Sequence, residues 1–159
     1  MNNIGNVTDK FYTAFSILDY KAMNSCYSAD AVFSDPVFGI LQGEEIKRMW
    51  EMLCKNARDF EVLFEHVKTD GEYVTYRWTA KYTFSKTGRK VVNNVTAYIL
   101  VQNNLIVEHT DEFDFYKWSR QALGLPGLLF GWSSVIKNKV RKNAKKNLEV
   151  FMKNSKIKI

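Results

Sequence analysis

Asp35 is the first residue of this sequence that could carry acid-base chemistry. It lies in residues 31–39, which read AVFSDPVFG and surround the carboxylate with apolar side chains. Apolar surroundings raise the pKa of a carboxylate toward the working pH, as a general base or acid requires. The alternative is structural, because an aspartate before a proline commonly caps a turn. The sequence alone leaves both interpretations open.

His109 and Asp111 are a second candidate group. They lie two residues apart in a segment that alternates like a β-strand, so both side chains project from one face. On a concave wall the carboxylate could fix the tautomer of the imidazole and form an acid-base pair with it. Asp114 has the opposite parity unless a β-bulge shifts the register. The alternative is that these polar side chains lie on the outer face of the sheet.

The sequence predicts no metal and no cofactor. His109 and Asp111 give at most two ligands from one wall, and His66 is expected to be an ordinary surface or core histidine. No glycine-rich phosphate loop or nucleophile elbow is present. Cys26 and Cys54 have no metal-ligand spacing around them and are expected to be buried free thiols.

Aromatic side chains are dense in the segments that would surround these polar residues. Aromatic residues line apolar ligand pockets, and they also fill ordinary cores. The candidates for ligand contact are Tyr12, Phe33, Trp50, Tyr76, Trp78, Tyr98 and Phe113.

The first third of the chain has a helical period. Apolar side chains recur at three- and four-residue spacing over residues 6–18, which predicts a helix. A second short helix is predicted over residues 19–27, and a third carries Ile46, Met49, Trp50 and Leu53 on one side. Residues 31–39 between them are expected to be extended, because Pro36 restricts the preceding residue to β-like dihedral angles.

After residue 60 the period changes to strict alternation. Four segments are rich in β-branched and aromatic residues, and short turns separate them. Such short connections join antiparallel neighbours, whereas parallel strands need long crossovers. We therefore predict a four-stranded antiparallel meander over residues 60–68, 73–84, 89–101 and 105–116.

The end of the chain is strongly basic. Ten Lys and Arg residues lie between Arg120 and Ile159 against one acid, Glu149. The apolar run LLFGW leads to a predicted helix over residues 133–154, whose apolar stripe is Ile136, Val140, Ala144, Leu148, Phe151 and Met152. This stripe is expected to dock on the domain or on a dimer mate. Alternatively, the helix lies on an anionic membrane with Trp132 inserted. Nucleic acid is not favoured, because no aromatic residues interleave the basic face.

Helices followed by a long meander indicate an α+β fold. Residues 31–39 resemble the stretch of bacterial ketosteroid isomerases that holds the catalytic aspartate, and residues 114–124, DFYKWSRQALG, resemble the end of SnoaL-like domains. The resemblance spans about residues 5–125 and points to the nuclear transport factor two-like superfamily. It implies a cone-shaped, curved antiparallel sheet of about four main strands wrapped around three N-terminal helices, with the C-terminal amphipathic helix added.

The resemblance also assigns roles to single residues. Asp35 falls on the catalytic aspartate of the isomerases, and Asp114 falls on that of the SnoaL-type cyclases. The two oxyanion donors of the isomerases would fall at Phe11 and Ala97, which donate no hydrogen bond. Steroid isomerase activity is therefore not expected, because an enolate would lack its stabilising donors.

These observations predict cofactor-free acid-base chemistry on a small hydrophobic molecule, of the isomerase, cyclase, dehydratase or hydrolase type. The alternative is a non-catalytic module that binds a small molecule or dimerises, held at a membrane surface by its C-terminal helix. We expect a SnoaL-like domain over residues 1–132 and a basic helix over residues 133–159. We also expect a cytoplasmic location, because the sequence has no apparent leader or spanning segment. The resemblance implies a homodimer.

Overall fold

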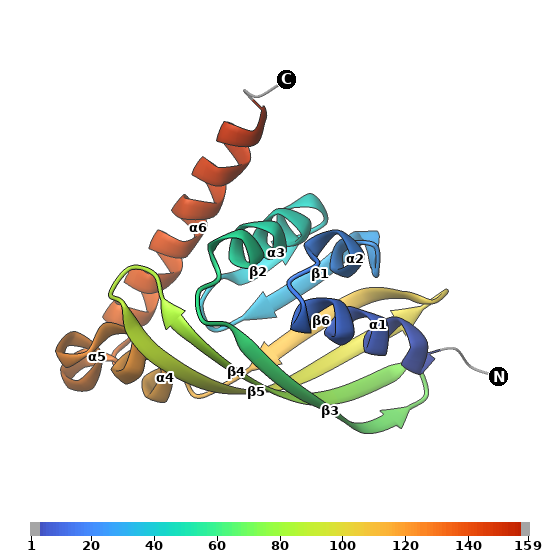
Figure 1. Cartoon of the computed structure of the whole chain (residues 1–159), viewed down its shortest axis with the longest axis horizontal. Coiled ribbons are helices and arrows are strands. Elements are labelled where there is room, and N and C mark those ends of the chain that lie inside the picture. The colour runs from blue at the N-terminus through green and yellow to red at the C-terminus, as the bar shows by residue number, and fades with distance from the viewer. Residues whose placement is uncertain (1–3, 157–159) are drawn as a thin grey trace.

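The computed structural model of the chain describes residues 4–156 (Figure 1). Its helices are α1 (Ile4–Ser16), α2 (Tyr20–Asn24), α3 (Glu44–Asn56), α4 (Phe115–Leu123), α5 (Leu125–Phe130) and α6 (Ser134–Lys156). Its strands are β1 (Tyr27–Asp35), β2 (Gly39–Gln42), β3 (Glu61–Asp70), β4 (Tyr73–Phe84), β5 (Arg89–Gln102) and β6 (Leu105–Glu112). The α+β class is confirmed, and three of the four alternating segments form strands close to their predicted bounds. The fourth ends at Glu112, and Phe115 and Tyr116, which were predicted to extend it, begin α4.

The strands form one curved sheet in the order β2-β1-β6-β5-β4-β3. It has six strands rather than about four, and it is mixed rather than purely antiparallel, because β1 runs parallel to β6. Residues 31–39 were expected only to be extended. They instead form most of a β-hairpin, with the turn at Pro36 and a positive φ of 69° at Gly39. The second helix also ends earlier than predicted, at Asn24, and Tyr27 already belongs to β1.

The core lies between the inner face of the sheet and helices α1 to α3, which cover it (Figure 1). Alternate residues of the strands point into this layer, as the period of two requires. Its largest fully buried side chains include Phe11, Phe33, Ile46, Met49, Ile99 and Ile106. The three helices therefore pack on the concave face of the sheet and bury its apolar side chains.

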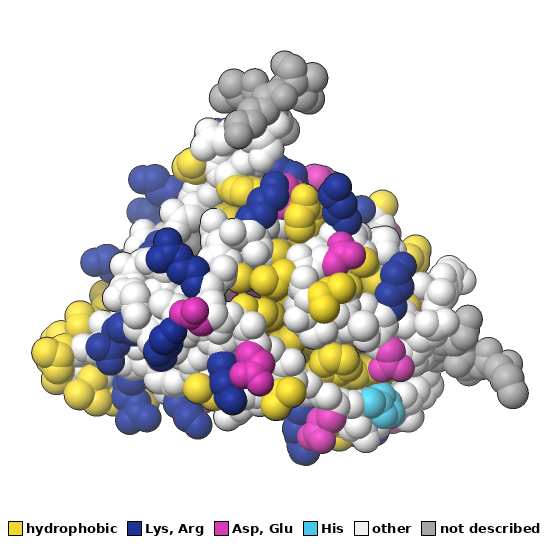
Figure 2. Space-filling view, viewed as in Figure 1, with side chains coloured by type: hydrophobic (Ala, Val, Ile, Leu, Met, Phe, Trp, Pro, Cys, Tyr) yellow, Lys and Arg dark blue, Asp and Glu magenta, His cyan; other side chains and the backbone are white. Residues whose placement is uncertain are grey.

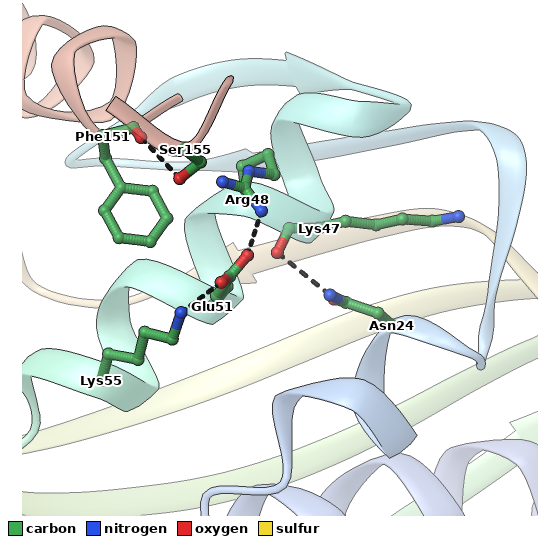
Figure 3. A network of polar contacts seen from close by, with 7 residues as sticks. All are labelled: Asn24, Lys47, Arg48, Glu51, Lys55, Phe151 and Ser155. Atoms are coloured by element: carbon green, nitrogen blue, oxygen red, sulfur yellow. Dashed lines mark hydrogen bonds and ion pairs between the residues drawn. The ribbon is translucent and has the colours of Figure 1, made fainter. Parts of the chain in front are cut away.

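Helix α6 packs its apolar stripe against the domain, so most of that stripe is not free. Leu148 is 3% exposed, and Ala144, Phe151 and Met152 pack against the core. The ring of Phe151 lies beside α3 (Figure 3). At this place on α3, Arg48 and Lys55 each form an ion pair with Glu51. The Arg48 guanidinium is 5.2 Å from the centre of the Phe151 ring, and the Lys55 ammonium is 5.8 Å from it.

Among residues 4–156, no helix is both long enough and apolar enough to cross a bilayer. The long α6 exposes lysines along its length, namely Lys137, Lys139, Lys142, Lys145, Lys146 and Lys153.

The packing of α6 on α3 predicts a specific cost for Phe151→Ala. The substitution removes the ring from the core and from both cations, so we expect the free energy of unfolding to fall by about 1–3 kcal/mol. Urea denaturation measures this change. The control is Val150→Ala on the neighbouring, exposed position, which should change stability by about 0.5 kcal/mol or less. Equal effects of the two substitutions would contradict the described packing.

Candidate active site

A cavity of about 710 Å³ lies between the inner face of the sheet, α3 and α6. Figure 2 shows hydrophobic side chains in a hollow near the middle of one face of the molecule. The lining is mostly apolar, with a few polar side chains among the apolar ones, which is typical of small-molecule sites. Lining residues include Phe33, Asp35, Met49, Trp50, Trp78, Ala80, Tyr82, Asp111, Phe113, Trp118, Val140, Ala144 and Phe151.

The structure brings together about half of the residues that the sequence singled out. Asp35 and Asp111 line the cavity, as do Phe33, Trp50, Trp78 and Phe113. His109 is 1% exposed and lies behind the wall, where its ring is 5.2 Å from the ring of Phe33. The other three aromatic candidates lie elsewhere. Tyr12 and Tyr76 are buried and stack on each other outside the lining, and Tyr98 is 45% exposed on the outer face of the sheet.

Asp35 caps the β1–β2 turn and also faces the cavity, so the two interpretations of this residue are compatible. Its Oδ1 accepts hydrogen bonds from the backbone N–H of Val37 at 2.9 Å and of Phe38 at 2.5 Å. No hydrogen bond of the described residues reaches its Oδ2. One oxygen therefore fixes the side chain while the other is available to a bound molecule.

Burial raises the pKa of Asp35 from 3.8 to about 7. The hydrogen bond from Phe38 opposes this shift, the negative charge of Asp111 adds to it, and the guanidinium of Arg141 lowers the pKa again. Arg141 extends from α6 to this turn, where it donates a hydrogen bond to the carbonyl of Pro36 at 3.4 Å. Near neutral pH, Asp35 is therefore able both to accept and to release a proton.

The register of β1 and β6 places Asp35 beside Asp111. Phe33 pairs with His109 and Ser34 with Thr110, so the next position of each strand holds an aspartate. Both aspartates share the parity of the buried residues two positions earlier, and adjacent strands lie about 4.8 Å apart. Two carboxylates thus line the cavity from neighbouring strands, close enough for Asp111 to raise the pKa of Asp35.

A chain of buried hydrogen bonds holds Asp111. The indole N–H of Trp50 donates to the Tyr27 hydroxyl at 3.1 Å, that hydroxyl contacts His109 Nδ1 at 2.6 Å, and His109 Nε2 contacts Asp111 Oδ1 at 3.0 Å. An indole N–H can only donate, so the Tyr27 O–H is left to donate to Nδ1. The proton of a neutral His109 then lies on Nε2 and is donated to Asp111. Burial also raises the pKa of Tyr27 well above its ordinary value, which keeps the phenol protonated.

Asp114 lies outside the cavity. Strand β6 ends at Glu112, and the exposed Asp114 caps α4 by accepting a hydrogen bond from the backbone N–H of Lys117 at 2.9 Å. The segment after the strand turns into a helix instead of extending the sheet, so no bulge brings this aspartate to the inner face. Sequence parity was the better guide here than the resemblance to the cyclases.

Phe11 and Ala97 occupy the places where the isomerase resemblance would put oxyanion donors, and both are fully buried. Ala97 pairs with Asp111 across β5 and β6, and the Phe11 ring is 5.5 Å from the ring of His109. Neither side chain can donate a hydrogen bond. Neither position can therefore stabilise an oxyanion, and the buried chain ends at Asp111, an acceptor.

The other titratable candidates of the sequence lie apart from this site. His66 is exposed and bonds Thr69, and Cys26 and Cys54 are buried and free. Within residues 4–156, no three His, Cys, Asp or Glu residues are close enough to one another to hold a metal ion.

Sequence reasoning missed several residues of the candidate site. Tyr27 was assigned to the second helix, so its place in the buried chain was not anticipated. Tyr82 and Trp118 both line the cavity and share a hydrogen bond of 2.9 Å, but they come from segments far apart in the sequence. The apolar stripe of α6 was recognised, but its pattern does not say which surface it covers.

The buried chain predicts that Tyr27→Phe is destabilising. The change leaves the Trp50 indole N–H and His109 Nδ1 without their partner, which should lower the free energy of unfolding by about 2–4 kcal/mol. Chemical denaturation measures it. Tyr98→Phe is the matched control, because its hydroxyl lies on an exposed residue, and it should be nearly neutral. A neutral Tyr27→Phe would contradict the described chain.

The raised pKa of Asp35 predicts a pH-dependent effect of Asp35→Asn on stability. The folded carboxyl binds its proton more tightly than the unfolded one, so its ionisation lowers stability as the pH rises from 3.8 to about 7. An asparagine keeps an oxygen for the two backbone N–H groups but does not ionise. We expect it to stabilise the protein by about 2–4 kcal/mol at about pH 8 and to lose this advantage at about pH 4.

Thermal unfolding of both proteins at the two pH values tests this expectation. The difference between variant and parent removes the contribution of the other titrating groups. A variant that is less stable than the parent at the higher pH would show that Asp35 stabilises the fold as an anion.

A family model and several solved structures match this chain. The model described as the SnoaL-like domain matches residues 8–109. No curated protein sequence matches the chain. A candidate SnoaL-like polyketide cyclase from Shewanella putrefaciens is similar over 77% of this chain and 87% of its own, with 21% identity and a TM-score of 0.64.

Two further solved structures share the architecture. An LEH-like epoxide hydrolase from M. tuberculosis matches over 78% of this chain and 92% of its own, with 21% identity and a TM-score of 0.64. A protein with a ketosteroid isomerase-like fold from Catenulispora acidiphila, in complex with trimethylamine, matches over 78% and 96%, with 15% identity and a TM-score of 0.65. At these identities the structures establish a common fold. Because the family model covers most of the sheet and its helices, the chain belongs to the family of SnoaL-like domains.

Proposed function

We propose that this chain is an enzyme that transfers protons on a small apolar molecule held in the cavity, using only its own side chains. The observation that carries the proposal is the pair of adjacent carboxylates on an apolar wall, one of which has a pKa of about 7. Perturbed carboxylates in clefts are typical of acid-base sites. The mostly apolar lining favours a hydrophobic substrate.

Asp35 is the general base of the proposed reaction. Its Oδ1 is held by two backbone N–H groups, so Oδ2 can take a proton from a substrate carbon or from a water molecule. Asp111 is the second group and would accept a hydrogen bond from a substrate hydroxyl or from that water. His109 is a positioning residue, because it contacts Asp111 and does not line the cavity.

Asp35 ionises near neutral pH, so it can accept a proton from the substrate and, once protonated, return that proton to another atom. A carboxyl of this kind suits reactions that move a proton, such as ring closure through a carbonyl or addition of water to an epoxide. The similar proteins described as a polyketide cyclase and an epoxide hydrolase support these two classes. Phe11 and Ala97 give no support to steroid isomerisation.

Two probes test the proposal without knowledge of the natural substrate. β-Tetralone reports proton abstraction, because its α-protons exchange in deuterated water and are followed by NMR. Styrene oxide reports water addition. We expect at least one of them to react faster than in buffer, with a rate that rises with pH through about 7 as Asp35 ionises.

Asp35→Asn should lower that rate by about 10²- to 10⁴-fold, because the base is removed while the turn is kept. Asp114→Asn is the matched control and should retain the rate, since this residue only caps α4. Quenching of tryptophan fluorescence measures binding, because Trp50, Trp78 and Trp118 line the cavity. Binding of both probes with no acceleration of either would favour the alternative, a non-catalytic binding module.

A further inference from the structure

An apolar corner of the molecule lies outside the candidate active site. Helix α5 and the start of α6 expose six large side chains between 46% and 72%, a set that we call the α5 corner: Leu125, Leu128, Leu129, Phe130, Trp132 and Val135. Figure 2 shows hydrophobic side chains gathered at the left of the molecule, where Figure 1 places α5. Contiguous exposed apolar groups on a soluble fold commonly mark an interaction surface.

The packing of α5 on α4 turns these side chains outward. A Cβ on Gly127 would lie 1.9 Å from the carbonyl oxygen of Ser119, and one on Gly131 would lie 2.0 Å from Ser119 Oγ. The helix therefore presents its glycines to α4, and its leucines and phenylalanine can only face away. The Tyr116 hydroxyl also donates to the carbonyl of Leu128 at 3.0 Å. The exposure thus follows from close, ordered packing.

The polar group of the corner tryptophan is already satisfied. The indole N–H of Trp132 donates to the carbonyl of Leu129 at 3.0 Å, while the residue is 72% exposed. Tryptophan is enriched at the boundary between lipid headgroups and hydrocarbon, where one part of the ring is wet and the other apolar. Trp132 can therefore enter an apolar layer while its indole N–H keeps its hydrogen bond to Leu129.

The segments around the corner carry charge of one sign. No Asp or Glu lies between Asp114 and Glu149, whereas eight Lys and Arg residues do. Seven of these are exposed, namely Lys117, Arg120, Lys137, Lys139, Lys142, Lys145 and Lys146. Figure 2 shows dark blue side chains beside the apolar corner. Apolar residues flanked by cations complement a surface that has anionic headgroups above hydrocarbon.

Other occupants fit this surface less well. Two copies that met through the corner would bring their cations together, which is unfavourable. Nucleic acid would pair with the lysines but would leave the leucines in water. Residues 4–156 supply no cover, because the six side chains are exposed and both ends of this range lie away from α5 (Figure 1).

We propose that the α5 corner docks this protein on the surface of an anionic lipid bilayer. Trp132, Phe130 and the leucines enter the headgroup region, and the surrounding lysines and arginines contact the headgroups. The apolar stripe of α6 takes no part, because Ala144, Leu148 and Phe151 pack on the domain. The contact is therefore made by a corner rather than by a helix lying flat along its stripe.

Co-sedimentation of the full chain with vesicles tests this proposal. We expect binding to vesicles of phosphatidylcholine with phosphatidylserine, and much weaker binding to phosphatidylcholine alone. The triple variant Leu129→Ser, Phe130→Ser and Trp132→Ser should lower the partition coefficient by about tenfold or more. The double variant Lys137→Gln and Lys139→Gln should lower it by about fivefold for each charge removed at low salt.

Matched controls change equally exposed residues elsewhere. The triple variant Ile17→Ser, Ile40→Ser and Leu63→Ser and the double variant Lys21→Gln and Lys68→Gln should bind vesicles like the parent. Circular dichroism establishes that each variant is folded. Absence of binding to the phosphatidylserine vesicles, or full binding by the corner variants, would overturn the proposal. A parent that dimerises through the corner and ignores vesicles would assign this surface to a second copy instead.

Discussion

The parallel pairing of β1 with β6 is the contact on which the candidate site depends. It sets Phe33 opposite His109 and, by continuation, Asp35 beside Asp111. It also brings Tyr27, at the start of β1, within hydrogen-bonding distance of His109. Residues 36–104 lie between these two strands. The entropy cost of closing so long a loop grows only slowly with its length. Buried aromatic packing around Phe11, Phe33 and Trp50 then stabilises the pairing.

Two neighbouring carboxylates in an apolar wall are electrostatically unfavourable. Asp35 and Asp111 differ in the hydrogen bonds that they accept. Asp111 receives the end of an oriented chain of hydrogen bonds that begins at Trp50. Asp35 receives two backbone N–H groups on one oxygen, and its pKa is still raised to about 7. Ionisation of such a carboxyl lowers stability at neutral pH. This asymmetry is the reason why Asp35, and not Asp111, is the proposed base.

Sequence patterns predicted much of this architecture, and physical reasons explain the remainder. Alternation located β3 to β6 because half-buried strands impose a period of two. It could not locate the partner of β1, because a parallel partner is remote in the sequence, or foresee that residues 31–39 form a hairpin. The alternation of side chains along the strand predicted that His109 and Asp111 lie on the inner face of the sheet and that Asp114 does not. Parity could not tell which inward-facing aromatic residues line the cavity. Trp78 lines it, whereas Tyr76 stacks on Tyr12 of α1 and does not.

Helix α6 lies beyond the residues that match the family model and contributes to the cavity. The match ends at residue 109, whereas Val140, Ala144 and Phe151 of α6 line the cavity. The same helix carries Arg141, which bonds the carbonyl of Pro36 and lowers the pKa of Asp35. The position of α6 therefore affects both the shape of the cavity and the pKa of Asp35. Because α6 begins at the α5 corner, a surface that holds this corner would also hold the wall of the site.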